Sequence, residues 1–134
     1  MNELFVPHDE SLELKRLGFE EETFGYWFKD RDEKYYVTYP KTSFTKWYIN
    51  YFNKKAIVLA PTYQQAFKWF RDKHKIDSYI RQIYICGEKA GYTIFIEQQY
   101  TDVMYQNDYG SYFTTYEEAE LACINFLIQI VKSC

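Results

Sequence analysis

Nucleophilic catalysis needs a nucleophile, a base and an orienting group held close together, and this chain has three cysteines and two histidines to supply them. Cys86, Cys123 and Cys134 are scattered along the sequence, and neither His8 nor His74 has a local setting that would activate a thiolate. No G-x-S-x-G, H-E-x-x-H, C-x-x-C or glycine-rich phosphate-binding motif is present. These residues therefore predict reduced thiols and no catalytic site.

Acidic residues are the other candidates for chemistry. Asp30 and Asp32 form an Asp-x-Asp pair that suits a divalent cation, but no further oxygen ligands follow at a recognisable spacing. Their segment, 30–34, has instead the polarity of a hairpin turn. His74 falls on the apolar stripe of a predicted helix, where we interpret it as a packing residue. The sequence thus predicts no metal site and no cofactor, and it favours a non-enzymatic protein.

Aromatic residues make up 22% of the chain, with 15 tyrosines among them. Tyrosine has a large apolar body and a polar tip, so it suits both a half-buried sheet face and a contact surface. One interpretation is that the rings enlarge a modest core, and the other is that several form a recognition surface. For the second, Trp69 is expected at the half-exposed flank of its helix, and Arg81 or Arg71 could contact an anion. The predicted binding residues are Trp47, Tyr48, Tyr51, Trp69, Arg81, Tyr105, Tyr109 and Tyr112.

The charge of the chain bears on its partners. The net charge is −3, and only 54–55 and 71–75 are dense in basic residues, so a phosphate backbone is a disfavoured partner. The longest apolar run, 124–131, is interrupted by Asn125 and Gln129 and is too short to span a bilayer. The N-terminus lacks a basic start followed by an apolar stretch, which predicts no secretion signal. We therefore expect a soluble, cytosolic-type protein with no membrane contact.

Three helices are predicted. The first covers about 9–17, with Asp9 or Ser11 as its N-cap and Gly18 as the glycine that ends it. The second covers 62–74 and the third about 115–132, and both begin with a Thr-Tyr-x-x-Ala phrase. In each phrase the threonine and the Gln or Glu three residues later form a capping box.

The last helix is apolar on most of its surface. Its predicted core face consists of Tyr116, Ala119, Cys123, Phe126, Leu127 and Ile130. A second apolar set consists of Leu121, Ile124, Ile128 and Val131. Either other parts of the chain or a second copy must cover that set, and the residues predicted for self-association are Leu121, Ile124 and Ile128.

The strands are predicted from aromatic and β-branched runs. Segments 24–29 and 35–39 form one hairpin, and 78–86 and 92–99 form another whose connector is 87–91. A further broken strand lies in 102–112. The segment 40–55 fits neither a strand period nor a helix period, so a third strand over 46–51 and an irregular aromatic loop both remain open.

The resulting order is α-β-β-(β)-α-β-β-(β)-α, which predicts an α+β fold with antiparallel sheets and helices packed on one face. A chain of this length fits a single domain, 1–134. The repeated helix phrase raises an internal duplication of 1–61 and 62–134, with a shared solution to helix entry as the alternative. The order within 62–132 is that of a double-stranded-RNA-binding domain, but acidic residues stand where that family needs a basic cluster.

Three segments carry a family resemblance: 59–73 (LAPTYQQAFKWFRDK), 115–122 (TYEEAELA) and 14–19 (LKRLGF). They resemble small uncharacterised proteins of Bacteroidetes bacteria and of the phages and prophages that those bacteria carry. The resemblance implies a phage or prophage setting in a bacterial host cell and no activity. Together with the aromatic content, it favours an accessory factor that binds a protein partner. The alternative is a small-ligand or nucleotide-binding domain that uses aromatic stacking and an arginine.

Overall fold

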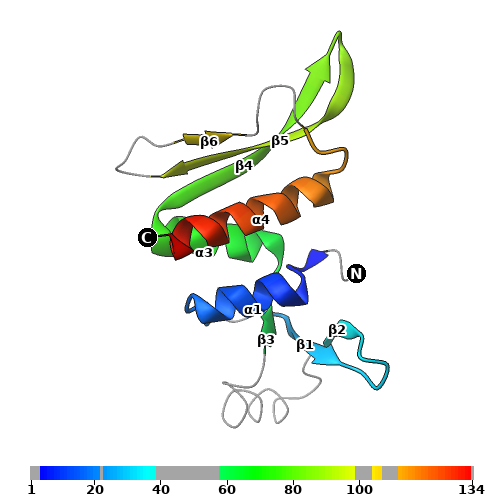
Figure 1. Ribbon diagram of the computed structural model, residues 1–134, viewed down its shortest axis with the longest axis vertical. Coiled ribbons are helices and arrows are strands. Elements are labelled where there is room, and N and C mark those ends of the chain that lie inside the picture. The colour runs from blue at the N-terminus through cyan, green and yellow to red at the C-terminus, as the bar shows by residue number, and fades with distance from the viewer. Residues whose placement is uncertain (1–3, 22, 39–57, 99–103, 107–111, 134) are drawn as a thin grey trace. The chain divides into compact units, whose positions relative to one another are not determined.

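The computed structural model describes residues 4–21, 23–38, 58–98, 104–106 and 112–133, and it divides the chain into two compact units, Met1–Thr62 and Tyr63–Cys134. In these ranges it contains three helices and two three-stranded antiparallel sheets, so the predicted α+β fold is confirmed (Figure 1). The two sheets differ in strand order. In the first unit, the strand that comes first in the sequence lies in the centre of the sheet, and in the second unit, the strand that comes second in the sequence does. The single domain and the duplication both stay predictions.

The first unit consists of helix α1 (His8–Arg16) and strands β1 (Gly25–Lys29), β2 (Tyr35–Thr38) and β3 (Val58–Ala60), with strand order β2-β1-β3. The predicted hairpin of β1 and β2 is confirmed, with Lys29 opposite Tyr35. The Asp30 carboxylate accepts hydrogen bonds from the backbone N–H groups of Asp32 and Lys34, both at 2.9 Å. This carboxylate therefore organises the turn, as the polar segment predicted.

Helix α1 begins differently from the prediction. Pro7 precedes it with extended backbone and no side-chain cap, and Asp9 and Ser11 lie inside the helix. Ser11 is buried, and its hydroxyl donates to the carbonyl of Val6 (2.9 Å) rather than to a free N–H group of the first turn. The two predicted N-caps are therefore wrong, because a proline already preorganises this entry.

The end of α1 agrees with the sequence. Gly18 has a φ of 100°, a left-handed conformation that glycine adopts without steric cost. The N–H of Phe19 donates to the carbonyl of Leu14 (2.9 Å), and both side chains are buried. This is the hydrogen bond that a glycine stop predicts.

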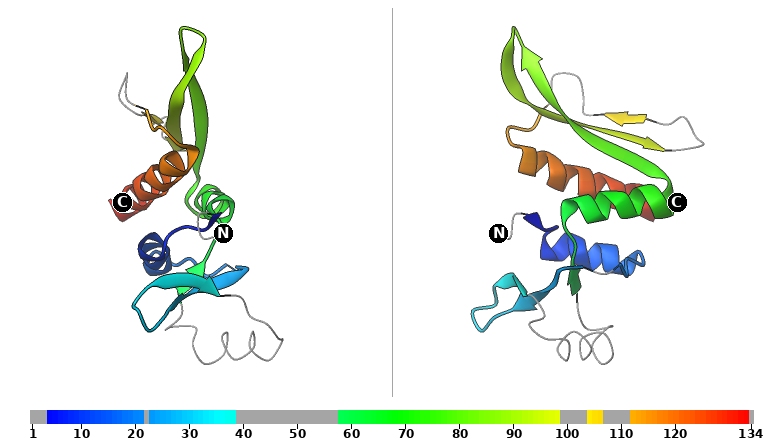
Figure 2. Two further views of the ribbon diagram at one scale, coloured as in Figure 1. Left: turned by 90° about the vertical axis from the view of Figure 1, so that its right-hand side faces the viewer. Right: turned by 180° about the vertical axis from the view of Figure 1, so that it is seen from behind.

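The second unit consists of helix α3 (Tyr63–His74), strands β4 (Ile76–Ile85), β5 (Glu88–Gln98) and β6 (Met104–Gln106), and helix α4 (Tyr116–Lys132). Its sheet has the order β4-β5-β6, and both helices pack against it. Figure 2 shows that β4 and β5 form a long twisted hairpin whose turn projects beyond both helices. This hairpin is the largest element that the sequence predicted.

The turn of this hairpin is tighter than predicted. Strands β4 and β5 extend to Ile85 and Glu88, so only Cys86 and Gly87 connect them, with φ values of 53° and 82°. Two positive φ values are typical of the two-residue turn that matches the twist of a hairpin. The predicted connector 87–91 is therefore wrong beyond Gly87, and Gly91 lies within β5.

Helix α4 begins as predicted, because the Thr115 hydroxyl accepts a hydrogen bond from the Glu118 N–H (3.1 Å). The carboxylate of Glu118 accepts instead from the hydroxyl of Thr114 (3.2 Å), so only half of the capping box forms as expected. The buried residues of the helix are Ala119, Glu120, Cys123, Ile124, Leu127 and Ile128.

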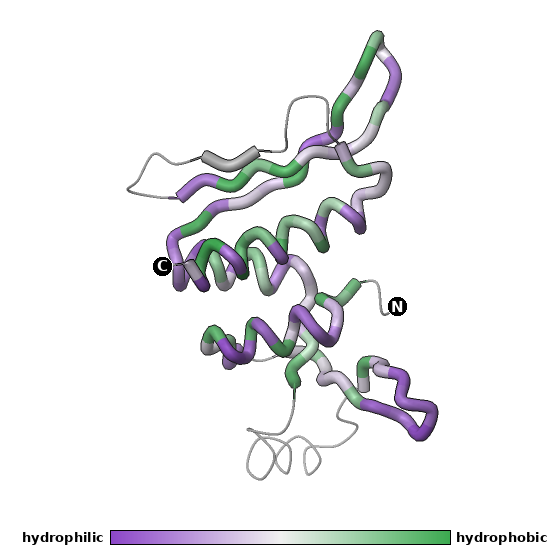
Figure 3. The backbone as a smooth tube through the Cα atoms, viewed as in Figure 1, coloured by the Kyte–Doolittle hydropathy of each residue, from purple (hydrophilic) through white to green (hydrophobic). Residues whose placement is uncertain are grey.

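The buried face of α4 is rotated from the predicted one. Tyr116 and Phe126 were predicted in the core, but both are exposed, and Phe126 is 52% exposed. Ile124 and Ile128 are only 0% and 2% exposed, so neither offers the surface that the predicted self-association requires. Figure 3 shows hydrophobic residues on several sides of α4, and such a helix leaves its orientation to the packing around it. Self-association itself stays a prediction, with Leu121 half-buried.

In helix α3, a residue that was predicted as half-exposed is buried. Trp69 was predicted at a half-exposed flank, but it is only 5% exposed and packs edge-on against Phe70 and His74, with ring centroids 5.1 and 4.8 Å away. His74 is a half-buried packing residue, as predicted. Burial, and then the charge of Lys73, lower the pKa of its imidazole. The buried residues of α3 are therefore Tyr63, Ala66, Trp69 and Phe70.

Candidate functional site

The β4–β5 hairpin presents two different faces. Residues Ser78 and Tyr92 face the helices, because Ser78 forms a hydrogen bond with Cys123 and the Tyr92 ring packs edge-on against Tyr116 (5.6 Å). The residues that alternate with these along each strand lie on the opposite face of the sheet, since successive side chains of a strand point to opposite faces. We call that face the helix-free face, defined by Asp77, Tyr79, Arg81, Phe95 and Glu97.

An aromatic pair lies on the helix-free face. Tyr79 of β4 is directly opposite Phe95 of β5, and their rings stack with centroids 4.9 Å apart and planes 11° apart. Tyr79 is nevertheless 52% exposed, so one side of its ring is open to solvent. Arg81 follows two residues later and is also exposed. This arrangement offers an aromatic surface beside a fixed positive charge.

The end of the hairpin is the second exposed apolar feature. We call residues 84–89 the hairpin tip. Tyr84 and Ile85 are 61% and 53% exposed, on opposite faces of β4, because the tip projects beyond the helices. The Tyr84 hydroxyl donates to the amide oxygen of Gln82 (2.7 Å), which holds its ring along the strand. The tip is therefore an ordered protrusion with apolar side chains on both sides.

Polar groups also lie beneath the sheet, on α4. Burial raises the pKa of the Glu120 carboxyl to about 7, and the charge of Glu117 adds to the rise. Burial also raises the pKa of the Cys123 thiol to about 12, although its hydrogen bond with Ser78 acts in the opposite direction. Cys123 is therefore a buried, unreactive thiol, as its core position predicted.

Glu120 should make stability depend on pH. Its folded-state pKa exceeds the ordinary value of 4.5, so between pH 4.5 and about 7 the folded chain binds more protons than the unfolded chain. The free energy of unfolding should therefore fall as pH rises through this window, by about 1–2 kcal/mol once solvent screening is allowed for. Glu120→Gln should remove most of that slope.

Urea titrations at pH 5 and pH 8 measure this effect. Glu88→Gln, which removes a charge from an exposed position of the same unit, is the matched control and should leave the slope unchanged. An equal slope in Glu120→Gln and the unmodified chain would contradict the assignment.

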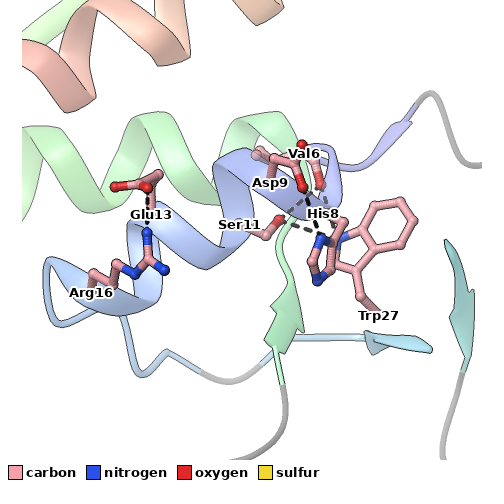
Figure 4. Close-up of polar contacts among 7 residues, drawn as sticks. All are labelled: Val6, His8, Asp9, Ser11, Glu13, Arg16 and Trp27. Carbon is pink, nitrogen blue, oxygen red and sulfur yellow. Dashed lines mark hydrogen bonds and ion pairs between the residues drawn. The ribbon is translucent and has the colours of Figure 1, made fainter. Parts of the chain in front are cut away.

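The first unit contains a separate polar cluster at the start of α1. Figure 4 shows the Trp27 indole N–H directed at two acceptors, the Val6 carbonyl (3.1 Å) and the Ser11 hydroxyl (3.2 Å). The His8 ring stacks on Tyr35 with centroids 3.6 Å apart, and its edge meets Trp27. These contacts join the start of α1 to strands β1 and β2, which is a structural role.

Trp27→Phe should therefore destabilise the first unit. The change removes the indole N–H and leaves Val6 with one side-chain donor, Ser11, for a loss of about 1 kcal/mol. Ser11→Ala removes the other side-chain donor to the Val6 carbonyl, so the double variant should lose more than the sum of the two single changes. Chemical unfolding of the four chains measures the coupling, and strict additivity would show that the two side chains act independently.

The structure separates the predicted binding residues. Trp69 is buried, which contradicts its assignment, whereas Arg81 and Tyr112 are exposed. Tyr105 lies in β6 at a position opposite Ile96. The segments that contain Trp47, Tyr48, Tyr51 and Tyr109 lie outside the described residues, so their assignment stays a prediction.

Sequence reasoning missed Tyr79, Tyr84 and Ile85 as exposed residues, and it missed the half-buried Phe95 as the partner of Tyr79. The signal for the tip was the Cys86-Gly87 pair, because a two-residue turn places its flanking residues at the far end of a hairpin. Tyr79 and Phe95 gave a weaker signal, since alternation identifies residues that share a face without showing which face the helices cover.

Comparisons with known proteins give no relative. Neither a protein-family model, nor a curated protein, nor a solved structure matches the chain. Among the helices that the structure describes, none has the length and hydropathy needed to cross a membrane. In the same ranges, no three His, Cys, Asp or Glu side chains gather as a metal ion would require.

Proposed function

We propose that this chain is a non-enzymatic binding protein that contacts a protein partner through the hairpin tip. The observation that carries the proposal is the exposure of Tyr84 and Ile85 at the end of an ordered hairpin. Aromatic and branched apolar side chains are typical of contact residues at protein interfaces. The resemblance noted above adds the setting, which is an accessory factor of phage or prophage origin acting in the bacterial cytoplasm.

The shape of the hairpin supports a protein partner. Two strands of 10 and 11 residues place the tip away from the helices, where it can enter a groove of another molecule. The tip also carries Glu88 and Lys89, and the Lys89 ammonium lies over the Tyr92 ring at 4.8 Å. Apolar residues with charged neighbours form the core and rim of many interfaces.

Site-specific photocrosslinking in the host cell tests the proposal. A photoreactive phenylalanine at position 84 should give one discrete adduct with a partner protein. The matched control is the same group at position 126, an exposed aromatic position on α4 of the same unit, which should give no such adduct. Tyr84→Ala/Ile85→Ala should abolish co-purification of that partner and change the free energy of unfolding by less than about 0.5 kcal/mol. Equal adducts from both positions, or none from position 84, would refute the proposal.

The alternative function has its own observation. Arg81 lies beside the stacked Tyr79–Phe95 pair, an arrangement that can stack a planar ligand and hold an anion. A thermal-shift screen with nucleotides separates the two functions. A rise of several degrees with one nucleotide, absent in Arg81→Ala, favours the small-ligand function.

A further inference from the structure

Strand β4 is an edge strand, and its residues 76–83 form a regular ladder with β5. It ends the sheet order β4-β5-β6, and no strand among the described residues pairs with its outer side. It is ten residues long and contains no proline or glycine. Protein edges are usually protected by short strands, proline, bulges or charged side chains, because a free edge can pair with another chain. The ladder of β4 shifts its register only between Ile83 and Tyr84, which is beyond residues 76–82.

The hydrogen bonding of the sheet shows which groups face this edge. Tyr92 and Phe113 exchange two backbone hydrogen bonds of 2.8 Å, so the polar groups of Tyr92 point away from β4. The direction of the backbone N–H and C=O groups alternates from one residue to the next along a strand. The backbone groups of Phe95 therefore point toward β4, where Tyr79 is its partner. It follows that the backbone groups of Tyr79 form hydrogen bonds with β5. The alternate residues of β4, which are Ser78, Ile80 and Gln82, direct their backbone N–H and C=O groups away from β5, toward the free edge.

Charge on the helix-free face is uneven along β4. Asp77 lies directly opposite Glu97, which places two carboxylates side by side. Arg81 lies opposite Thr93, and it makes no ion pair with any described residue. Asp77 and Arg81 stand two residues on either side of Tyr79, so the strand carries opposite charges symmetrically about a tyrosine.

We propose that β4 pairs antiparallel with β4 of a second copy, on a two-fold axis at Tyr79, to form a continuous six-stranded sheet. In this register Ser78 exchanges backbone bonds with the second copy's Ile80, which uses the outward groups. Tyr79 then lies opposite itself, and each Asp77 lies opposite an Arg81. These pairs are of the kind without backbone bonds, where facing side chains are closest. The register extends the stacked rings across the two-fold axis and places an Arg81 guanidinium beside each Asp77.

Other registers are less favourable. An axis at Arg81 would place two arginines opposite each other, and an axis at Asp77 would place two aspartates opposite each other. An axis at Ile80 would leave Asp77 opposite Ile83. Only the axis at Tyr79 places each Asp77 opposite an Arg81, so the charge pattern favours a second copy as the partner and this register.

This inference does not rest on the proposed function. The paired segment ends at Gln82, which leaves both hairpin tips outside the new sheet. It also differs from the predicted association through α4, since no residue of that helix takes part.

A charge exchange in the full chain tests the dimer. Sedimentation velocity over a concentration series should show a reversible dimer whose dissociation constant rises at least about tenfold in Asp77→Arg and in Arg81→Asp. The double variant Asp77→Arg/Arg81→Asp should restore the original dissociation constant, because opposite charges face each other again. Unfolding of each variant confirms that it folds. A monomer at all concentrations, or a dimer that the single changes do not weaken, would overturn the proposal.

Disulfide formation tests the register. In a Cys86→Ser/Cys134→Ser background, Tyr79→Cys should form a covalent dimer on mild oxidation, because facing Cα atoms about 4.5 Å apart lie within disulfide range. Arg81→Cys is the matched control and should form none, since its expected partner is Asp77. Covalent dimers from Arg81→Cys, or none from Tyr79→Cys, would overturn the register.

Discussion

Replacing Trp69 with alanine should lower the free energy of unfolding by about 3–5 kcal/mol. The indole is almost fully buried on α3, where it packs edge-on against Phe70 and His74. Alanine would remove these contacts and leave a cavity that a packed helix face fills only in part. Urea-induced unfolding followed by circular dichroism measures the loss.

Phe126→Ala is the matched control, because the sequence predicted Trp69 as half-exposed and Phe126 as buried, whereas the structure has Trp69 buried and Phe126 exposed. Phe126 was predicted in the core of α4 but is largely exposed, so its removal should change stability by less than about 0.5 kcal/mol. Trp69→Phe should give an intermediate loss, since it keeps an aromatic ring in the same place. A loss from Phe126→Ala as large as that from Trp69→Ala would contradict the described faces of both helices.

The second large effect is expected at Gly91. A Cβ atom there would lie 2.4 Å from the backbone carbonyl oxygen of Phe113 and 2.5 Å from the Tyr112 ring. The chain passes this close because Tyr92 and Phe113 form an isolated bridge next to the glycine. Gly91→Ala should therefore cost about 3 kcal/mol, near the upper end of the usual range for overpacking, because the obstructing atom belongs to the backbone.

Gly87→Asn separates this steric effect from the conformational freedom of glycine. Gly87 has a φ of 82° and open space around its Cα, and asparagine tolerates left-handed backbone. The change at Gly87 should therefore cost less than the change at Gly91 when both are measured by chemical unfolding. Equal losses would show that Gly91 is needed for a reason other than the approach of Phe113.

Residues with strong local signals were predictable from the sequence. Gly18 ended α1, and Thr115 capped α4, because a left-handed glycine and a capping hydroxyl act within one helical turn. Asp30 likewise organised its turn through bonds to backbone N–H groups only two and four residues away. The alternation along β4 and β5 correctly indicated a hairpin, since neighbouring strands share one local period.

The candidate site was less predictable. Arg81 was identified, but Tyr79 beside it was not, because a strand with apolar residues on both faces does not show which face the helices will cover. The hairpin tip was missed because the glycine at position 91 suggested a five-residue connector. That glycine in fact makes room for Phe113, a contact between residues far apart in the sequence.

The sequence by itself determined the class of the fold, the three described helices, the two hairpins and several of their ends. These depend on interactions within a few residues, and such interactions are written directly in the residue types. The sequence did not predict β3 (Val58–Ala60), and the segment 46–51, where a third strand was left open, lies outside the described residues. Only the tertiary structure decided that Trp69 is buried, that Phe126 is exposed, and that β4 lies at the edge of its sheet. Each of these depends on which side of an element another element occupies, and a helix or strand that is apolar on both sides leaves that choice to the packing of the whole unit.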